Sequence, residues 1–136
     1  MVEINKTPQE VVAGDDSIVI RRFIDGIEGG RALDVTAFAS VAGTTIVKAG
    51  AIIIKDTDGK YKPAPIKKAD DSVEYDTIVA STVVGILTAT IDASITGGAI
   101  MTAGRVNKVV MPYGGNGKVA DVASALPHIA FVSDAD

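Results

Sequence analysis

The fold of this chain is decided by residues 44–112, which read TTIVKAGAIIIKDTDGKYKPAPIKKADDSVEYDTIVASTVVGILTATIDASITGGAIMTAGRVNKVVMP. Val and Ile gather there in short runs, and glycines separate the runs at short intervals. β-Branched side chains favour the extended backbone, and glycine-containing turns let the chain reverse between strands. The pattern predicts a mainly β fold, a small antiparallel β-barrel or sandwich.

The rest of the chain adds to this core an extended, flexible N-terminal arm over residues 1–17. With 136 residues, the chain is long enough for a single β-rich domain over 18–136. Residues 1–17 are mostly polar, and their apolar anchors are Val2, Ile4, Val11 and Val12. Two interpretations of the arm remain open: a frayed terminus, or a segment that orders only against a partner.

Composition and charge exclude several classes of function. The net charge of −4 argues against a nucleic-acid partner, which normally selects a basic excess. The chain has no cysteine, so disulfides and thiolate metal sites are excluded. The first residues lack the apolar segment of a secretory signal, and the longest apolar stretch, 78–91, is too short to span a bilayer. We therefore expect a soluble protein made in the cytoplasm, with no membrane partner.

Alternating and β-branched runs predict the strands in the first half of the chain. These strands are Ser17–Ile24, Arg31–Phe38, Thr44–Lys48, Ala51–Lys55 and Lys60–Lys62, with a tight hairpin turn at Asp56–Gly59 before the last.

The second half is predicted to begin with a polar loop over residues 66–76. The following run, Thr77–Ile91, is too long for one flat strand, and Gly85 indicates a bulge or sharp bend within it. Ala99–Thr102 and Arg105–Met111 are expected to pair as two strands that turn at Ala103–Gly104.

One short helix is predicted near the C-terminus. Val119, Val122, Ala123 and Leu126 recur with helical spacing, and a proline directly after Leu126 ends the helix. The chain then returns to extended structure over Ile129–Val132.

Residues that commonly carry chemistry are sparse. His128 is the one histidine, so a multi-histidine metal site is excluded, and its place between a proline and an apolar strand favours a structural role. Asp56 and Asp58 resemble part of a calcium loop, but the remaining ligands are missing and a hairpin turn explains them. We expect no catalytic residue, cofactor or metal, and therefore no enzyme.

A local basic cluster lies in the middle of the chain, at Lys60, Lys62, Lys67 and Lys68. It is compatible with contact to a nucleic acid or an acidic partner. The alternative is a solvated hairpin edge, where lysines prevent edge-to-edge pairing of strands.

Several short motifs resemble, in their order along the chain, the tailed-phage head decoration proteins, the capsid-stabilising family of the lambda type. The motifs are GRALDVT at 30–36, VKAGAII at 47–53, DGKYKP at 58–63, VGIL at 84–87, GAIMTAGRVN at 98–107 and ALPHIAFV at 125–132. They span most of residues 30–132.

The resemblance implies a cement protein that trimerises on the outer surface of a virion head and bridges major capsid protein subunits. It further implies that the N-terminal arm adds to a neighbouring capsid subunit, so that Val2, Ile4, Val11 and Val12 are the expected capsid-binding residues. The segment Ser17–Gly29 departs from the family pattern. Two alternatives remain open: the capsid-anchoring base of a head fibre, and a glycan-binding β-module of an adhesin.

Overall fold

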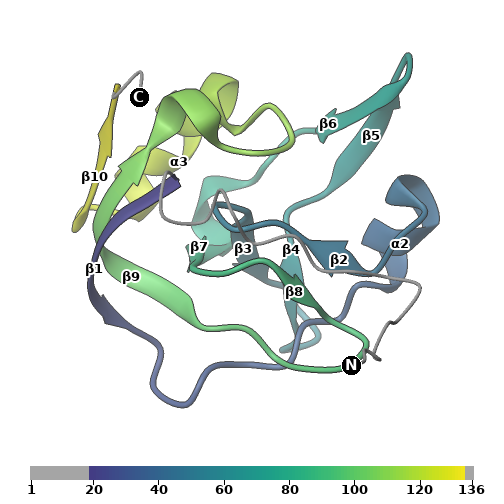
Figure 1. Cartoon of the computed structure of the whole chain (residues 1–136), viewed down its shortest axis with the longest axis horizontal. Coiled ribbons are helices and arrows are strands. Elements are labelled where there is room, and N and C mark those ends of the chain that lie inside the picture. The colour runs from purple at the N-terminus through teal and green to yellow at the C-terminus, as the bar shows by residue number, and fades with distance from the viewer. Residues whose placement is uncertain (1–18, 134–136) are drawn as a thin grey trace, which may run out of the picture.

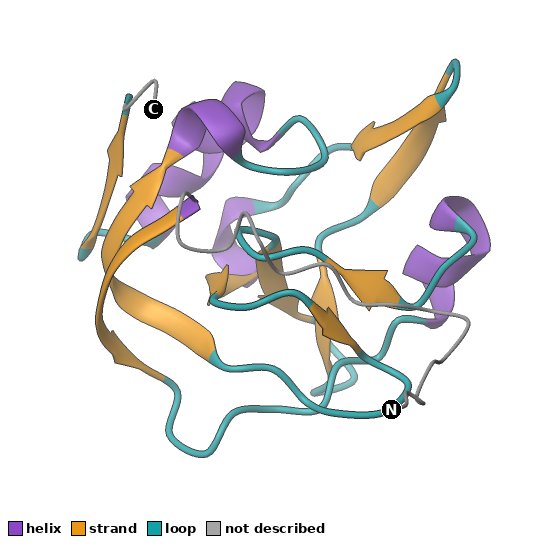
Figure 2. Cartoon of the chain, in the orientation of Figure 1, coloured by secondary structure: helices purple, strands orange, loops and turns teal. Residues whose placement is uncertain are grey.

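The computed structural model of the chain describes residues 19–133 (Figure 1). This part is mainly β, as expected from its β-branched runs, and the strands are connected by loops and short helical turns (Figure 2). Its strands are β1 Ile20–Gly26, β2 Ile46–Val47, β3 Ile52–Lys55, β4 Tyr61–Pro63, β5 Ile66–Ala69, β6 Ser72–Tyr75, β7 Val83–Leu87, β8 Ile91–Asp92, β9 Ile100–Asn107 and β10 Ile129–Val132. Its helices are α2 Thr36–Ala42, α3 Val119–Val122 and the 3-10 turns η1 Ala80–Thr82, η2 Lys108–Val110, η3 Gly115–Lys118 and η4 Ala123–Ala125.

The main sheet has the strand order β1-β9-β7-β3-β4 and is built around the long strand β9. β1 runs antiparallel along one edge of β9, while β7 and then β10 share its other edge; β10 runs parallel to β9. Within residues 19–133 no ladder joins β1 to β4, so this sheet is open and sandwich-like, and it does not close into a barrel. Two small antiparallel pairs, β2–β8 and β5–β6, complete the structure.

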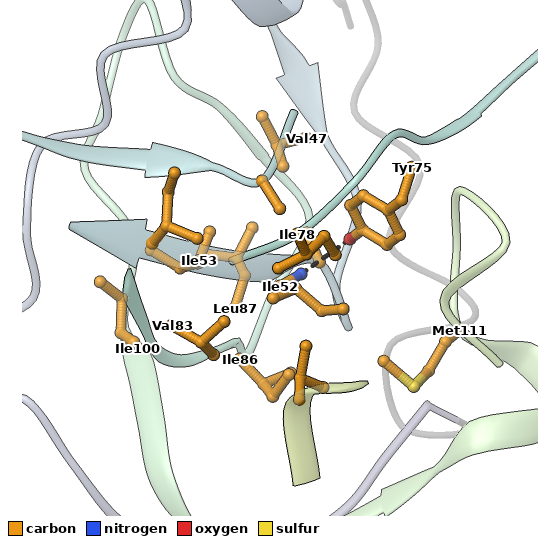
Figure 3. Packing of buried hydrophobic residues seen from close by; sticks show 14 of the residues in the cluster. Val47, Ile52, Ile53, Tyr75, Ile78, Val83, Ile86, Leu87, Ile100 and Met111 are labelled. Carbon is orange, nitrogen blue, oxygen red and sulfur yellow. Dashed lines mark hydrogen bonds between the residues drawn. The ribbon is translucent and has the colours of Figure 1, made fainter. Parts of the chain in front are cut away.

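The core is aliphatic and centres on strands β3, β7 and β9. Ile52, Ile53 and Ile54 are consecutive and all buried, so both faces of β3 are covered. Ile86, Leu87 and Ile100 on the neighbouring strands lie around them (Figure 3), and these three residues and Met101 are fully buried. This packing accounts for the Val- and Ile-rich sequence of residues 44–112.

The irregularity predicted at Gly85 is confirmed. The pairing of β3 with β7 shifts register between Ile53, which lies opposite Gly85, and Ile54, which lies opposite Val83. A Cβ atom at Gly85 would lie 2.5 Å from both the Ile100 side chain and the carbonyl oxygen of Met101. Glycine at this position therefore allows β9 to pack directly against β7.

The strand predicted over Arg31–Phe38 is wrong. Only isolated bridges, at Arg31 and Leu33, form there, and helix α2 follows. The carboxylate of Asp34 accepts hydrogen bonds from the hydroxyl and the backbone N–H of Thr36, at 2.8 and 3.1 Å, and this local turn begins the helix. Residues 19–133 therefore contain, besides α3, the α-helix α2, which the sequence prediction of a single short helix missed.

The polar loop predicted over residues 66–76 is also wrong, because this segment forms the β5–β6 hairpin. Its base is apolar: Ile66 pairs with Tyr75, and both are buried. Lys67, Lys68 and Glu74 are exposed residues of these two strands. Because their side chains are polar, the sequence pattern indicated a loop.

The two strands expected at Ala99–Thr102 and Arg105–Met111 are one continuous strand, β9, followed by η2. Gly104 does not turn the chain. It lets β1 approach β9, since a Cβ atom there would collide with the carbonyl oxygen of Arg22 and the sulfur of Met101.

The remaining elements deviate less from the prediction. The first strand begins and ends later than expected, at Ile20–Gly26, and β2 covers only Ile46–Val47 of the strand expected at Thr44–Lys48. The hairpin at Asp56–Gly59, the helix at Val119 and the extended segment Ile129–Val132 are confirmed.

Candidate functional site

The residues that the sequence singled out for capsid binding, Val2, Ile4, Val11 and Val12, lie outside the described residues, as does the rest of the N-terminal arm at 1–17. The described residues instead bring together an aromatic cluster, a pocket beside it, an ion-pair cluster and an exposed edge strand.

The aromatic cluster consists of Phe38, Tyr75 and Tyr113, which come from α2, the end of β6 and the loop after η2. The Phe38 and Tyr113 rings meet edge to face with centroids 5.4 Å apart, and the Tyr75 and Tyr113 rings do so at 5.8 Å. Such pairs contribute about 0.5–1.5 kcal/mol beyond the area that they bury. The cluster therefore ties three distant segments to one another.

Tyr113 is held at the centre of this cluster by its backbone and its hydroxyl. Its backbone has a φ of 59°, a conformation that non-glycine residues rarely adopt. The carbonyl oxygen of Tyr113 accepts a hydrogen bond from the backbone N–H of Tyr75 at 2.9 Å, and its hydroxyl accepts one from the N–H of Lys48 at 3.0 Å. Burial raises the pKa of the Tyr113 hydroxyl above its ordinary value of 10.0.

Tyr75 lies deeper and joins the aromatic cluster to the core. Its side chain is buried, and its hydroxyl accepts a hydrogen bond from the N–H of Ile52 at 2.8 Å (Figure 3). Burial strongly raises the pKa of this hydroxyl as well. Both tyrosines are therefore neutral at physiological pH and act as hydrogen-bonding and packing groups.

A pocket of about 460 Å³ opens next to Tyr113, between α2, β2 and the β5–β6 hairpin. Its walls are mostly apolar, and Lys48, whose backbone N–H donates to the Tyr113 hydroxyl, is one of them. The lining residues are Phe38, Ala42, Thr44, Ile46, Lys48, Val73, Thr90 and Tyr113. Mostly apolar concave walls of this kind suit a small apolar group.

The ion-pair cluster lies at the β3–β4 turn. The amine of Lys62 lies 2.9 Å from Asp56 and 3.2 Å from Asp58, and Lys60 lies 3.9 Å from Asp34. The hydrogen bond that the Lys62 amine donates to Asp56 lowers the pKa of Asp56 and raises the pKa of Lys62. The aspartates that resembled a calcium loop thus bind a lysine in this turn.

The basic cluster predicted from the sequence is therefore divided. Lys60 and Lys62 are engaged by these carboxylates on β4 and its turn, whereas Lys67 and Lys68 stand on the separate β5–β6 hairpin. Tyr61 on β4 has two other cations over its ring, Arg31 at 5.7 Å and Lys55 at 5.5 Å. Within the described residues, the four lysines form no single basic face.

His128 is exposed, so its side chain does not fill the core. Its backbone carbonyl accepts a hydrogen bond from the N–H of Gly104 at 3.1 Å, which helps to position β10 beside β9. Among residues 19–133, no three metal-ligating side chains gather in one place.

Strand β1 forms an exposed edge of the main sheet. All five residues from Arg21 to Asp25 are exposed, and the side chains of Phe23 and Ile24 are 55% and 60% exposed. In the described part of the chain, β1 pairs only with β9, so its outer edge has no strand partner there. An exposed apolar strand at an open sheet edge is typical of a surface that another chain covers.

The comparisons with protein-family models, curated proteins and solved structures gave no match to this chain. No helix in the described range is long and apolar enough to cross a bilayer.

Sequence reasoning missed the aromatic cluster and the pocket. The chain has only three Phe and three Tyr, and half of these six residues meet at one place. The scarcity of aromatic residues in an otherwise aliphatic chain was the one available signal, because Phe38, Tyr75 and Tyr113 share no motif or spacing.

Proposed function

We propose that this protein is a structural capsid decoration protein of a tailed phage. In this role it trimerises on the outer surface of the head and stabilises the shell by bridging major capsid protein subunits. The function is adhesion to a symmetric lattice, and no catalytic step is part of it.

The observation that carries the proposal is the exposed edge strand β1. Phe23 and Ile24 stand more than half exposed on a strand whose neighbours Arg21, Arg22 and Asp25 are exposed as well. Burial of an apolar side chain of this size at an interface contributes about 1.5–3 kcal/mol. In a cyclic oligomer or a lattice, each copy of the protein can cover the exposed edge of the next copy, so such an edge fits a protein that assembles in this way.

The aliphatic core supports the same proposal. A decoration protein transmits load between capsid subunits, and tightly packed cores have low compressibility. The fully buried residues Ile52, Ile53, Ile86 and Leu87 connect the middle strands of the sheet into such a core. The β1 edge then provides a contact surface on a stiff support.

The capsid contact itself is assigned to the N-terminal arm through Val2, Ile4, Val11 and Val12. The test is cosedimentation of the protein with expanded capsids assembled from tailed-phage major capsid protein. Deletion of residues 1–16 is expected to leave a folded trimer that no longer pellets with the capsids. Replacement of the four anchors by Ser, which keeps the chain length, should give the same loss.

Undiminished pelleting of both variants would remove the arm from the capsid contact, and a wild-type protein that never pellets would remove the proposed function. The alternative of a head-fibre base predicts the same pelleting, together with a further protein bound to the decorated capsid. The alternative of a glycan-binding module predicts micromolar binding on a glycan array and no pelleting.

A further inference from the structure

At the end of β1, the carboxyl group of Asp25 lies against the backbone nitrogen that follows it. The N–H of Gly26 donates a hydrogen bond to Oδ1 of Asp25 at 2.8 Å, and Asp25 is exposed to solvent. The contact brings this nitrogen close to Cγ of the same side chain, which is bonded to Oδ1. A nucleophile held beside the carbon that it attacks needs little further ordering to react. The two groups are therefore placed for closure of a five-membered ring.

The pairing of β1 with β9 directs this N–H away from the sheet. Successive N–H groups of an antiparallel strand point alternately toward the partner strand and away from it. The N–H of Ile27 donates to the carbonyl oxygen of Ile100 at 2.9 Å, so the preceding N–H, that of Gly26, points to the outer side of β1. The pairing also shifts register between Asp25 and Gly26. The Gly26 N–H thus faces the carboxylate of Asp25 and not β9.

Two other glycines in the chain follow an Asp or Asn, in the sequences Asp58–Gly59 and Asn116–Gly117. In both, the fold engages the glycine N–H in a main-chain turn. It donates to the carbonyl oxygen of Asp56 at 2.9 Å in the first sequence, and to the carbonyl oxygen of Gly114 at 3.1 Å in the second. These two nitrogens are therefore held by a carbonyl oxygen, whereas the nitrogen of Gly26 is held by the carboxylate of Asp25.

The contact between a carboxylate and the next nitrogen also occurs where no glycine follows. Asp56 and Asp76 accept hydrogen bonds from the next N–H at 2.7 and 2.8 Å, but a threonine follows each of them. A β-branched side chain crowds the nitrogen and stiffens its surroundings, whereas glycine leaves the nitrogen open and the backbone adaptable. Among residues 19–133, Asp25 is the one aspartate or asparagine that combines the contact with a following glycine.

We propose that Asp25 is a site of spontaneous isomerisation, at which an aspartyl linkage becomes an isoaspartyl linkage. The Gly26 nitrogen attacks Cγ of the protonated carboxyl group, a C–N bond forms, the nitrogen gives its proton to solvent, and the carboxyl hydroxyl leaves as water. The resulting succinimide then takes up one water molecule. Cleavage of the bond from nitrogen to Cγ restores aspartate, and cleavage of the bond from nitrogen to the main-chain carbonyl carbon gives isoaspartate.

The product alters the exposed edge strand. Isoaspartate adds Cβ of residue 25 to the main chain, directly before a glycine that is already in close contact with β9: a Cβ atom on Gly26 would collide with the carbonyl oxygen of Ile100. We therefore expect the end of β1 to separate from β9, next to the exposed side chains of Phe23 and Ile24. All reacting atoms belong to one chain, so failure of this proposal would leave the proposed function standing.

The test follows the full-length wild-type protein over weeks in a mildly acidic buffer, once folded and once unfolded in guanidinium chloride. Trypsin places the three sites in separate peptides, residues 23–31, 56–60 and 109–118. Liquid chromatography with electron-transfer fragmentation distinguishes isoaspartate from aspartate in each peptide.

In the folded chain, isoaspartate should accumulate at least about tenfold faster at position 25 than at position 58, because only Asp25 is held against the next nitrogen. In the unfolded chain the two rates should approach each other, since the local sequence alone then acts. Equal rates at the two positions in the folded chain, or the same ratio in the unfolded chain, would overturn the proposal.

A second variant uses the asparagine that already precedes a glycine. Asp25→Asn replaces an exposed carboxyl group by an amide of the same shape, and its ring closure releases ammonia. In the folded chain, deamidation at position 25 should be at least about tenfold faster than at Asn116, because the N–H of Gly117 is held by the carbonyl oxygen of Gly114. Deamidation at equal rates at the two positions would contradict the proposed geometry of the site.

Discussion

The buried hydroxyl of Tyr75 accepts a hydrogen bond from the backbone N–H of Ile52 at 2.8 Å, and this contact joins the end of β6 to the beginning of β3. The N–H of Ile52 lies where the chain enters the central strand of the core. Its partner comes from the hairpin that the sequence presents as a polar loop. The Tyr75 hydroxyl therefore accepts the hydrogen bond of the Ile52 N–H, which no neighbouring strand of the sheet accepts within residues 19–133.

Replacement of Tyr75 by Phe should therefore destabilise the protein while leaving the ring packing intact. The loss leaves the buried N–H of Ile52 without its partner, which costs about 1–3 kcal/mol. The free energy of unfolding in urea measures this cost. Tyr61→Phe is the matched control, since it removes a hydroxyl from a half-buried ring and should change the free energy by less than about 0.5 kcal/mol. Equal stabilities of the two variants would contradict the role of the hydroxyl.

Replacement of Gly85 by Ala tests the close approach of β7 and β9. The added Cβ atom would lie 2.5 Å from the Ile100 side chain and from the Met101 carbonyl oxygen, so one strand must shift. Overpacking of this kind costs about 1–3 kcal/mol. Gly117→Ala is the control, because a Cβ atom there meets nothing within 4 Å. Thermal unfolding should show a clear drop in Tm for the first variant only, and a wild-type Tm for Gly85→Ala would refute this packing.

The sequence predicts those parts of the fold that depend on neighbouring residues, and it misses those that depend on contacts between distant segments. The strands β3 and β7, the hairpin at Asp56–Gly59 and the helix at Val119 follow from short runs, turn residues and spacing, and the sequence predicts them. Helix α2 was missed because a side-chain turn at Asp34 overrides the alternating pattern that follows it. The pocket was missed because its wall comes from segments far apart, which only the folded chain brings together.

The response to acid follows from the carboxylates that accept hydrogen bonds. In Asp92, hydrogen bonds from the hydroxyls of Thr45 and Ser94, at 2.6 and 2.7 Å, lower the pKa below its ordinary value of 3.8. Asp34, Asp56 and Asp58 have lowered pKa values for similar reasons. A carboxyl group with a lowered pKa in the folded state stabilises the fold above its unfolded pKa, and this stability is lost as the pH falls through the folded value.

We therefore expect the Tm to fall as the pH drops below about 4. Asp92→Asn should lower the Tm at neutral pH and make the decline in acid shallower, because one of the titrating groups is gone. Asp71→Asn on the exposed β5–β6 turn is the control and should follow the wild-type curve. A decline of the same steepness in Asp92→Asn and in the wild type would argue against a contribution of Asp92 to acid sensitivity.

The edge strand β1 gives a prediction about assembly. Phe23→Ser combined with Ile24→Ser should leave the fold intact, since both side chains are more than half exposed, and should weaken the self-association of the protein by at least about tenfold. Val79→Ser, at a side chain that is 59% exposed, provides a control away from β1. Sedimentation velocity over a range of concentrations compares the three proteins. Unchanged association of the double variant would exclude β1 from the interface.

The most direct test of an adhesive, lattice-binding protein is its mass in solution, measured by light scattering after size-exclusion chromatography at micromolar concentration. We predict a particle of three times the chain mass of 13.9 kDa. A particle of 13.9 kDa at every concentration tested would contradict the account.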